Sequence, residues 1–342
     1  MKPERTEIQE LGEFGLIDRL TRNNEITQMS TLLSTGDDTA VVDHLGKPVL
    51  ITTDMLLEGI HFDLAYVPLK HLGYKSVVVN LSDICAMGGI PTQITVSIGI
   101  SNRFSVEALD EFYEGIYAAC SRYQVDLVGG DTCSSMRGFV ISVTAIGTPA
   151  VDKYITRSGA KVNDLICVTG YLGSAYLGLQ LLEREKKIFL ENPNIQPDLQ
   201  QKAHIVGKFL KPEARTDIID WLTSESLFPS AMIDVSDGLS SELKHLCKQS
   251  HTGCHIYEDK LPIHEEARGM AMEFGVDPTT CALNGGEDYE LLFTIPPQHY
   301  EQIKNHPDIS VIGYMTELEK GMYLETRQGN KHELVAQGWK AF

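Results

Sequence analysis

The stretch LGYKSVVVNLSDICAMGGIPTQITVSIGI, residues 72–100, predicts a helix that passes through a glycine turn into a strand. Residues 72–87 place Val77, Leu81 and Ile84 on one face at helical spacing, which indicates an amphipathic helix. Residues 93–100 form a strand-like run that is apolar enough to be buried on both faces. We therefore expect a domain that mixes helices and strands around this stretch.

The same two patterns recur along the rest of the chain. Strands are predicted at 49–52, 139–146, 165–168, 231–235, 290–295 and 310–312, and helices at 106–123, 175–185 and 239–249. This mixture indicates an α/β or α+β fold. The composition changes near Thr148-Pro149-Ala150, so we expect two domains, 1–150 and 151–342, with 191–201 as a surface loop.

Composition and charge narrow the possible functions. The 342 residues are 42% hydrophobic and 22% charged, as in an ordinary globular protein of about two domains. The net charge of -18 argues against nucleic acid or an anionic membrane as a partner. The seven cysteines form no CxxC pair, and no apolar run is long enough for a signal peptide or a membrane span. We expect a cytoplasmic protein.

Six short acidic clusters lie mostly where an apolar run meets a glycine turn. Carboxylates with neighbouring Ser and Thr hydroxyls form the oxygen-rich surroundings that Mg²⁺ prefers, and Mg²⁺ commonly accompanies phosphates. The sequence has neither GxxxxGK[ST] nor GxGxxG, so the two commonest phosphate-binding loops are missing. These features predict a metal-dependent nucleotide enzyme. The clusters are GDD at 36–38, TTD at 52–54, LSD at 81–83, GGD at 129–131, DVSD at 234–237 and GGED at 285–288.

Two of the aspartates stand out because of their positions in predicted elements. Asp83 lies near the C-terminus of the helix at 72–87, where the helix dipole disfavours a carboxylate, and Asn80 lies one turn earlier on the same face. Asp54 is expected at the end of a strand beside the core, where a carboxylate needs a partner. A metal role is the preferred interpretation of Asp83.

The other clusters each admit a structural alternative. Asp37 and Asp38 follow Gly36 and could be ordinary turn residues. Asp237 precedes Gly238 and a predicted helix, so it could be only the N-cap of that helix. Asp234, inside an apolar run, is harder to explain as structural, and Asp131 follows two glycines that would let the backbone approach a ligand.

Seven motifs follow one another in order from residue 36: GDDTAVV, TTDMLLEGIHF, VVVNLSDICAMGG, LVGGDT, TRSGAKVND, IDVSDGLSSEL and NGGEDYELLFT. Together with the C-terminal end of the chain, these motifs resemble the thiamine-monophosphate kinase family. The resemblance implies transfer of phosphate from ATP to thiamine monophosphate, several Mg²⁺ ions, and a homodimer formed through the N-terminal sheet. A related ATP-dependent synthetase and a non-catalytic nucleotide-binding scaffold are the alternatives.

The resemblance also implies roles for individual residues. It implies magnesium ligands at Asp38, Thr53, Asp54, Asp83, Asp131, Asp234 and Asp237. It implies ATP contacts at Tyr113, Gly130, Asp131, Arg157 and Ser236. It implies contacts to the vitamin at His61, Glu287 and Trp339, with Phe342 as the alternative aromatic.

These assignments fit the chemistry of the expected reaction. The acceptor phosphate has a second pKa near 6, so its oxygen is largely deprotonated at neutral pH and no strong general base is needed. Repulsion between two phosphates is the main obstacle, and metal ions held by aspartates would relieve it. Arg157 suits the nucleotide phosphates, and Trp339 and Glu287 suit the cationic vitamin. We expect His61 to contact substrate rather than act as a nucleophile.

Overall fold

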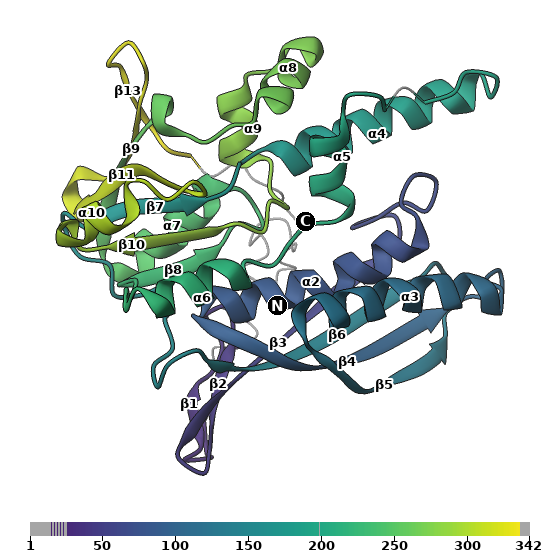
Figure 1. Ribbon diagram of the computed structural model, residues 1–342, viewed down its shortest axis with the longest axis horizontal. Coiled ribbons are helices and arrows are strands. Elements are labelled where there is room, and N and C mark those ends of the chain that lie inside the picture. Colours follow the sequence, from purple (N-terminus) through teal and green to yellow (C-terminus); the bar gives the residue numbers. More distant parts are fainter. Residues whose placement is uncertain are drawn as a thin grey trace, which may run out of the picture.

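The computed structural model describes residues 15, 17, 19, 21, 23, 26–197 and 199–335, and these residues form two β-sheets with helices between and beside them (Figure 1). The first sheet has the strand order β1-β2-β3-β6-β4-β5. Its strands are β1 (Thr31–Leu33), β2 (Ala40–His44), β3 (Lys47–Leu57), β4 (Gly89–Ile100), β5 (Asp126–Ser134) and β6 (Val140–Pro149).

One face of the first sheet is covered by α2 (Leu69–Ala86) and α3 (Val106–Tyr123) (Figure 1). The side chains of β4 that face these helices, such as Ile94, Val96 and Ile98, are buried. Thr95 and Ser97, which alternate with them, are only half-buried. Among the described residues, the opposite face of the sheet is therefore left largely uncovered, and we call it the open face.

Helices α2 and α3 are in direct backbone contact. A Cβ atom added at Gly73 would lie 1.9 Å from the carbonyl oxygen of Phe112, and one added at Gly115 would lie 1.9 Å from that of Lys70. Because real side chains do not approach a carbonyl so closely, glycine is required at both positions. The two glycines set the spacing of the helices.

The second sheet has the strand order β13-β12-β9-β11-β7-β10-β8. Its strands are β7 (Leu165–Thr169), β8 (Ala231–Asp234), β9 (Thr252–Tyr257), β10 (Leu291–Ile295), β11 (Ile309–Glu317), β12 (Met322–Glu325) and β13 (Lys331–Glu333). The accompanying helices are α4 (Ser174–Glu191), α5 (Ala203–Leu210), α6 (Thr216–Ser224), α7 (Leu239–Ser250), α8 (Glu265–Phe274), α9 (Pro278–Asn284) and α10 (Tyr300–Ile303).

A single apolar cluster joins the two halves of the chain. It runs from Ile84 on α2 to Ile218 on α6 and Phe293 on β10, and all three are buried. In both sheets the described strands pair antiparallel, except for β4 with β5 and β9 with β12. The fold is therefore a mixed one in which neighbouring strands are mostly antiparallel, as the α+β alternative predicts.

The prediction of elements succeeded where periodicity was strong. The predicted helix at 106–123 is α3, and the one at 72–87 is α2, which begins three residues earlier after Pro68. All of the predicted strands exist, but six others were missed: β1, β2, β5, β9, β12 and β13. Gly129, Gly130 and Asp131 lie within β5, so this acidic cluster is not at a glycine turn.

Two local predictions also need correction. Strand β3 continues to Leu57, so Asp54 lies within the strand rather than at its end. The N-cap of α7 is Gly238, so the alternative that Asp237 only caps this helix is wrong. No helix among the described residues is both long and apolar enough to cross a membrane.

Candidate active site

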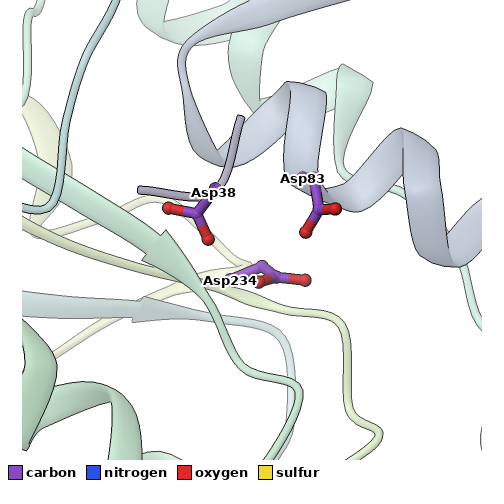
Figure 2. A group of neighbouring side chains, drawn as sticks. All are labelled: Asp38, Asp83 and Asp234. Atoms are coloured by element: carbon purple, nitrogen blue, oxygen red, sulfur yellow. The ribbon is translucent and has the colours of Figure 1, made fainter. Parts of the chain in front are cut away.

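Three aspartate side chains from separate segments converge between the two halves of the chain. Asp38 lies in the loop between β1 and β2, Asp83 in the last turn of α2, and Asp234 at the end of β8. One carboxylate oxygen from each lies within 4.8 Å of the others. Figure 2 shows the three carboxylates gathered around a common space. We call this region the aspartate end of the site.

Neighbouring polar groups orient the three carboxylates. The Thr52 hydroxyl donates to Asp83 Oδ2 at 2.6 Å, and the Ser82 hydroxyl donates to Asp234 Oδ2 at 2.6 Å. Asp38 accepts two hydrogen bonds from the Arg157 guanidinium, at 3.0 and 2.8 Å.

Arg157 also anchors the neighbouring aspartate. Its backbone N–H donates to Asp37 Oδ1 at 3.1 Å. Asp37 therefore helps to hold the loop that carries Asp38, a role consistent with the structural alternative for this residue. Among the described residues, Arg157 is the cation that pairs with the three-aspartate cluster.

Burial and mutual repulsion change the acidity of this cluster. Burial, and next the charge of Asp38, raise the pKa of Asp234 to about 7. Burial raises the pKa of Asp54 to about 6. Burial, followed by the charges of Asp54, Asp234 and Asp38, raises the pKa of Asp83 well above its usual value. A hard divalent cation would relieve this repulsion, so the oxygen donor set fits Mg²⁺.

Two further carboxylates flank the aspartate end. The backbone N–H of Asp54 donates to Asn80 Oδ1 at 3.0 Å, which fixes β3 against α2. The backbone N–H of Asp237 donates to Glu242 Oε1 at 3.1 Å. Glu242 is buried, and its Oε2 atom has no hydrogen-bond partner among the described residues. Sequence reasoning missed Glu242, although its position five residues after Asp237 permits a contact back to the start of α7.

The aspartate end opens into a cleft of about 960 Å³. Most of the predicted site residues line this cleft, which places groups from across the sequence around one space. These residues are Asp38, Thr53, Asp54, His61, Asp83, Arg157, Asp234, Ser236, Asp237 and Glu287.

The other end of the cleft, which we call the distal end, holds two of the predicted vitamin contacts. His61 Nδ1 accepts the backbone N–H of Leu57 at 3.0 Å, so the neutral ring carries its proton on Nε2. Burial lowers the pKa of His61, which favours this neutral form. The Glu287 carboxylate lies 3.0 Å from Lys75 Nζ.

A tight turn positions Glu287. Its φ of 58° follows Gly286 at 73°, and a Cβ atom added to Gly286 would lie 2.7 Å from Ser236 O. Its backbone N–H donates to Ser236 O at 2.6 Å. The GGED motif and the DVSD motif are therefore joined through their backbones.

Several residues of the distal end were not predicted. Lys75 is buried on α2, and its Nζ also donates to Phe209 O at 3.2 Å. Four residues of α4 spaced along one helical face line the cleft, which periodicity indicates as a face but not as a site. These are Tyr176, Leu179, Gln180 and Glu183.

Three predicted residues do not join the cleft. Tyr113 packs on α3 with its ring 5.7 Å from that of Phe112. Gly130 and Asp131 lie on the exposed edge strand β5, and the pairing of Asp131 with Ser97 places its side chain on the open face of the sheet. Trp339 and Phe342 lie outside the described residues.

Thr53 lines the cleft but its hydroxyl is engaged elsewhere. The hydroxyl donates to Val143 O at 3.0 Å and accepts from the Thr144 hydroxyl at 3.2 Å. The pairing of Thr53 with Thr144 places this side chain on the face of the sheet opposite to Asp54, so a contact from Thr53 to a metal would use its backbone carbonyl.

Comparison with known proteins places this geometry in a family. Residues 36–148 match the model of the AIR synthase related protein, N-terminal domain. The thiamine-monophosphate kinase of Aquifex aeolicus is 35% identical over 98% of this chain and 99% of its own. The Bacillus subtilis enzyme of the same name is 33% identical over 97% of this chain and 100% of its own.

Solved structures agree with the sequence relatives. The structure of AaThiL complexed with AMPPCP and TMP has a TM-score of 0.83, with 33% identity over 99% of both chains. The hydrogenase maturation protein HypE has a TM-score of 0.67, with 20% identity over 93% of this chain and 96% of its own, and so shares the fold alone. Because relatives above 30% identity extend along nearly the whole chain, the protein belongs to the thiamine-monophosphate kinase family.

Proposed function

We propose that the protein transfers the γ-phosphoryl group of ATP to thiamine monophosphate, giving ADP and thiamine diphosphate. The observation that carries the proposal is the convergence of Asp38, Asp83 and Asp234, two of them buried, at one end of a cleft of about 960 Å³. Family membership and the structural match to a protein complexed with AMPPCP and TMP support it.

We further propose that the aspartate end holds several Mg²⁺ ions. Asp38, Asp54, Asp83, Asp234 and Asp237 are the residues at the cleft that would hold them. When bound, the metal would neutralise charge on the donor and acceptor phosphates. Thr53 and Asp131 remain proposed ligands by resemblance.

The protein's own groups would mainly bind and orient the substrates. Arg157 presents a planar guanidinium at the cleft, suited to nucleotide phosphates, and Asp38 holds that guanidinium in place. Ser236 and the turn at Gly286 border the same space. His61 can donate from Nε2 to the acceptor side. The acceptor phosphate is already largely deprotonated at neutral pH, so none of these groups needs to remove a proton.

An assay of ADP release with thiamine monophosphate, free thiamine or buffer alone tests this function. We expect turnover with thiamine monophosphate only, because the phosphate-binding end requires an acceptor phosphate. Comparable release with free thiamine would contradict the proposal. Product analysis separates the alternative of a related ATP-dependent synthetase, which would not form thiamine diphosphate.

We also propose a homodimer in which the open face of the first sheet is covered by a second copy. Met55 on this face is 54% exposed and Val128 on β5 is 57% exposed, which is unusual for apolar strand residues. Within each chain we propose two domains, 1–150 and 151–342, of which the first would form the dimer. Light scattering at micromolar concentration should give twice the chain mass, and a strictly monomeric mass would refute the dimer.

All seven cysteines are free thiols. Free thiols suit a reducing compartment, so we place the enzyme in the cytoplasm.

A further inference from the structure

The distal end of the cleft contains three carboxylates with different surroundings. Asp63 and Glu183 line it together with Glu287. Lys186 Nζ lies 2.5 Å from Asp63 Oδ2, and Lys75 Nζ lies 3.0 Å from Glu287 Oε1. Each of these two carboxylates therefore has an ammonium partner of its own.

Glu183 differs from the other two. The Tyr66 hydroxyl donates to its Oε1 atom at 2.7 Å, and a phenol carries no charge to offset the carboxylate. Among the described residues, no lysine or arginine nitrogen lies within 4.0 Å of the Glu183 carboxylate, the distance that defines an ion pair. Three carboxylates and two ammonium groups leave one negative charge at the distal end, and the pairing assigns it to Glu183.

The position of Glu183 gives a ligand access to this charge. Tyr176, Leu179, Gln180 and Glu183 follow helical spacing, so they present one face of α4 to the cleft. Tyr66 lies opposite, with its ring centroid 6.3 Å from that of Phe209. The distal end thus combines one unpaired carboxylate with aromatic surfaces, which suits a flat organic cation.

We propose that Glu183, held in place by Tyr66, is the residue that recognises the positive charge of the thiazolium ring. This inference rests on the proposed function. It moves charge recognition away from Glu287, whose charge Lys75 already neutralises, and leaves Glu287 a hydrogen-bonding and packing role. A pairing of one anion with one cation keeps the distal end neutral in the complex.

The test compares Glu183→Gln with two related variants. Glutamine keeps an oxygen that can accept from Tyr66, so only the charge is lost. Glu287→Gln removes the other candidate charge, and Glu191→Gln is a matched control at the exposed end of the same helix. KM and kcat for thiamine monophosphate are measured for each, together with inhibition by the phosphate ester of uncharged hydroxyethylthiazole.

We expect Glu183→Gln to raise KM for thiamine monophosphate about ten-fold with kcat within about two-fold, because the charge contact is made in ground and transition states alike. Inhibition by the uncharged thiazole phosphate should not weaken. Glu191→Gln should behave as wild type. Tyr66→Phe, which leaves the charge but loosens its position, should raise KM by about two- to three-fold.

An unchanged KM in Glu183→Gln, with a raised KM in Glu287→Gln, would overturn the inference. Equal weakening of the charged and uncharged ligands would also overturn it, since that pattern indicates loss of shape rather than of charge. Failure of the proposed function has a different signature: the wild-type protein would not phosphorylate thiamine monophosphate at all.

Discussion

At the aspartate end of the cleft, three carboxylates converge and one guanidinium pairs with Asp38 alone among them, whereas at the distal end Asp63 and Glu287 each face their own ammonium group. The first arrangement leaves excess negative charge in a buried place, which suits a site completed by metal ions. The second arrangement pairs two of its three carboxylates and leaves only the charge of Glu183 before substrate arrives. The two ends should therefore respond differently to loss of a carboxylate and to removal of metal.

The largest effect is expected from Asp83→Asn. Asp83 would hold metal between the donor and acceptor phosphates, an interaction that strengthens in the transition state, so its loss should lower kcat by about 10²- to 10³-fold. Excess Mg²⁺ should recover part of the activity. The KM for thiamine monophosphate should change less than kcat does.

 A near-normal kcat in this variant, with Mg²⁺ at wild-type concentration, would contradict the assignment of Asp83 to the metal-holding group. Glu242→Gln serves as the comparison, since it alters a buried carboxyl group beside Asp237 but keeps an oxygen that can accept the Asp237 N–H. We expect this variant to keep most of its kcat.

The next effect concerns the stability of the distal end. Lys75→Met should lower the free energy of unfolding by about 1–3 kcal/mol, because it leaves the partly buried Glu287 carboxylate without its partner. Urea denaturation measures the change. Adding Glu287→Gln to Lys75→Met should restore part of the loss, and strictly additive losses in the double variant would show that the two side chains do not interact.

The third effect is a pH dependence of protein stability that arises at the aspartate end. The pKa of Asp234 is raised to about 7 in the folded protein, so between about pH 4 and pH 7 the folded state binds more protons than the unfolded state. The stability of metal-free protein should therefore fall as pH rises through this window. Asp234→Asn removes this group, so in EDTA it should be more stable than wild type at pH 7.5, by on the order of 1–3 kcal/mol.

At pH 4.5 the unfolding free energies of wild type and Asp234→Asn should differ little, because Asp234 is protonated in the folded wild type. Thermal unfolding at the two pH values, with EDTA and then with Mg²⁺, provides the measurement. Mg²⁺ should stabilise wild type more than Asp234→Asn. If EDTA-treated wild type were the more stable protein at pH 7.5, the aspartate end would not carry the repulsion described here.

The smallest effect is expected at the mouth of the distal end. The Asp63–Lys186 pair is partly exposed, so Asp63→Asn should cost less than about 1 kcal/mol of stability. Raising the salt concentration should shrink the difference further. A loss of several kcal/mol would mean that the distal end depends on this pair more than its exposure suggests.

The sequence predicted the aspartate end better than the distal end, for a physical reason. Asp38, Asp83 and Asp234 each belong to a short motif of acidic and hydroxyl residues, and the hydroxyl that donates to Asp234 comes from Ser82 in the motif of Asp83. The contact between Tyr66 and Glu183 joins residues 117 positions apart, and neither belongs to a motif. Only the packing of α4 against the 59–66 segment brings them together.

The alternation of side chains between the two faces of a strand explains why Asp54 reaches the cleft and Asp131 does not. Asp131 and Asp54 were both expected to be magnesium ligands by resemblance, and each ends a short motif after an apolar run interrupted by Gly or Thr. In the sheet, Asp54 pairs with Val143 and Asp131 pairs with Ser97, and these partners belong to opposite faces. The direction of a side chain depends on register and bulges, which cannot be read from either run alone.

The contact between α2 and α3 at Gly73 and Gly115 makes the active site sensitive to helix spacing. A methyl group at Gly73 would have to move from 1.9 Å to more than about 3 Å from the carbonyl oxygen of Phe112, which displaces α2 by on the order of 1 Å. Asp83 travels with the same rigid helix, and misplacement on that scale can cost about 100-fold in rate. A search for inactivating substitutions should therefore recover glycines that bear no functional group and touch no substrate.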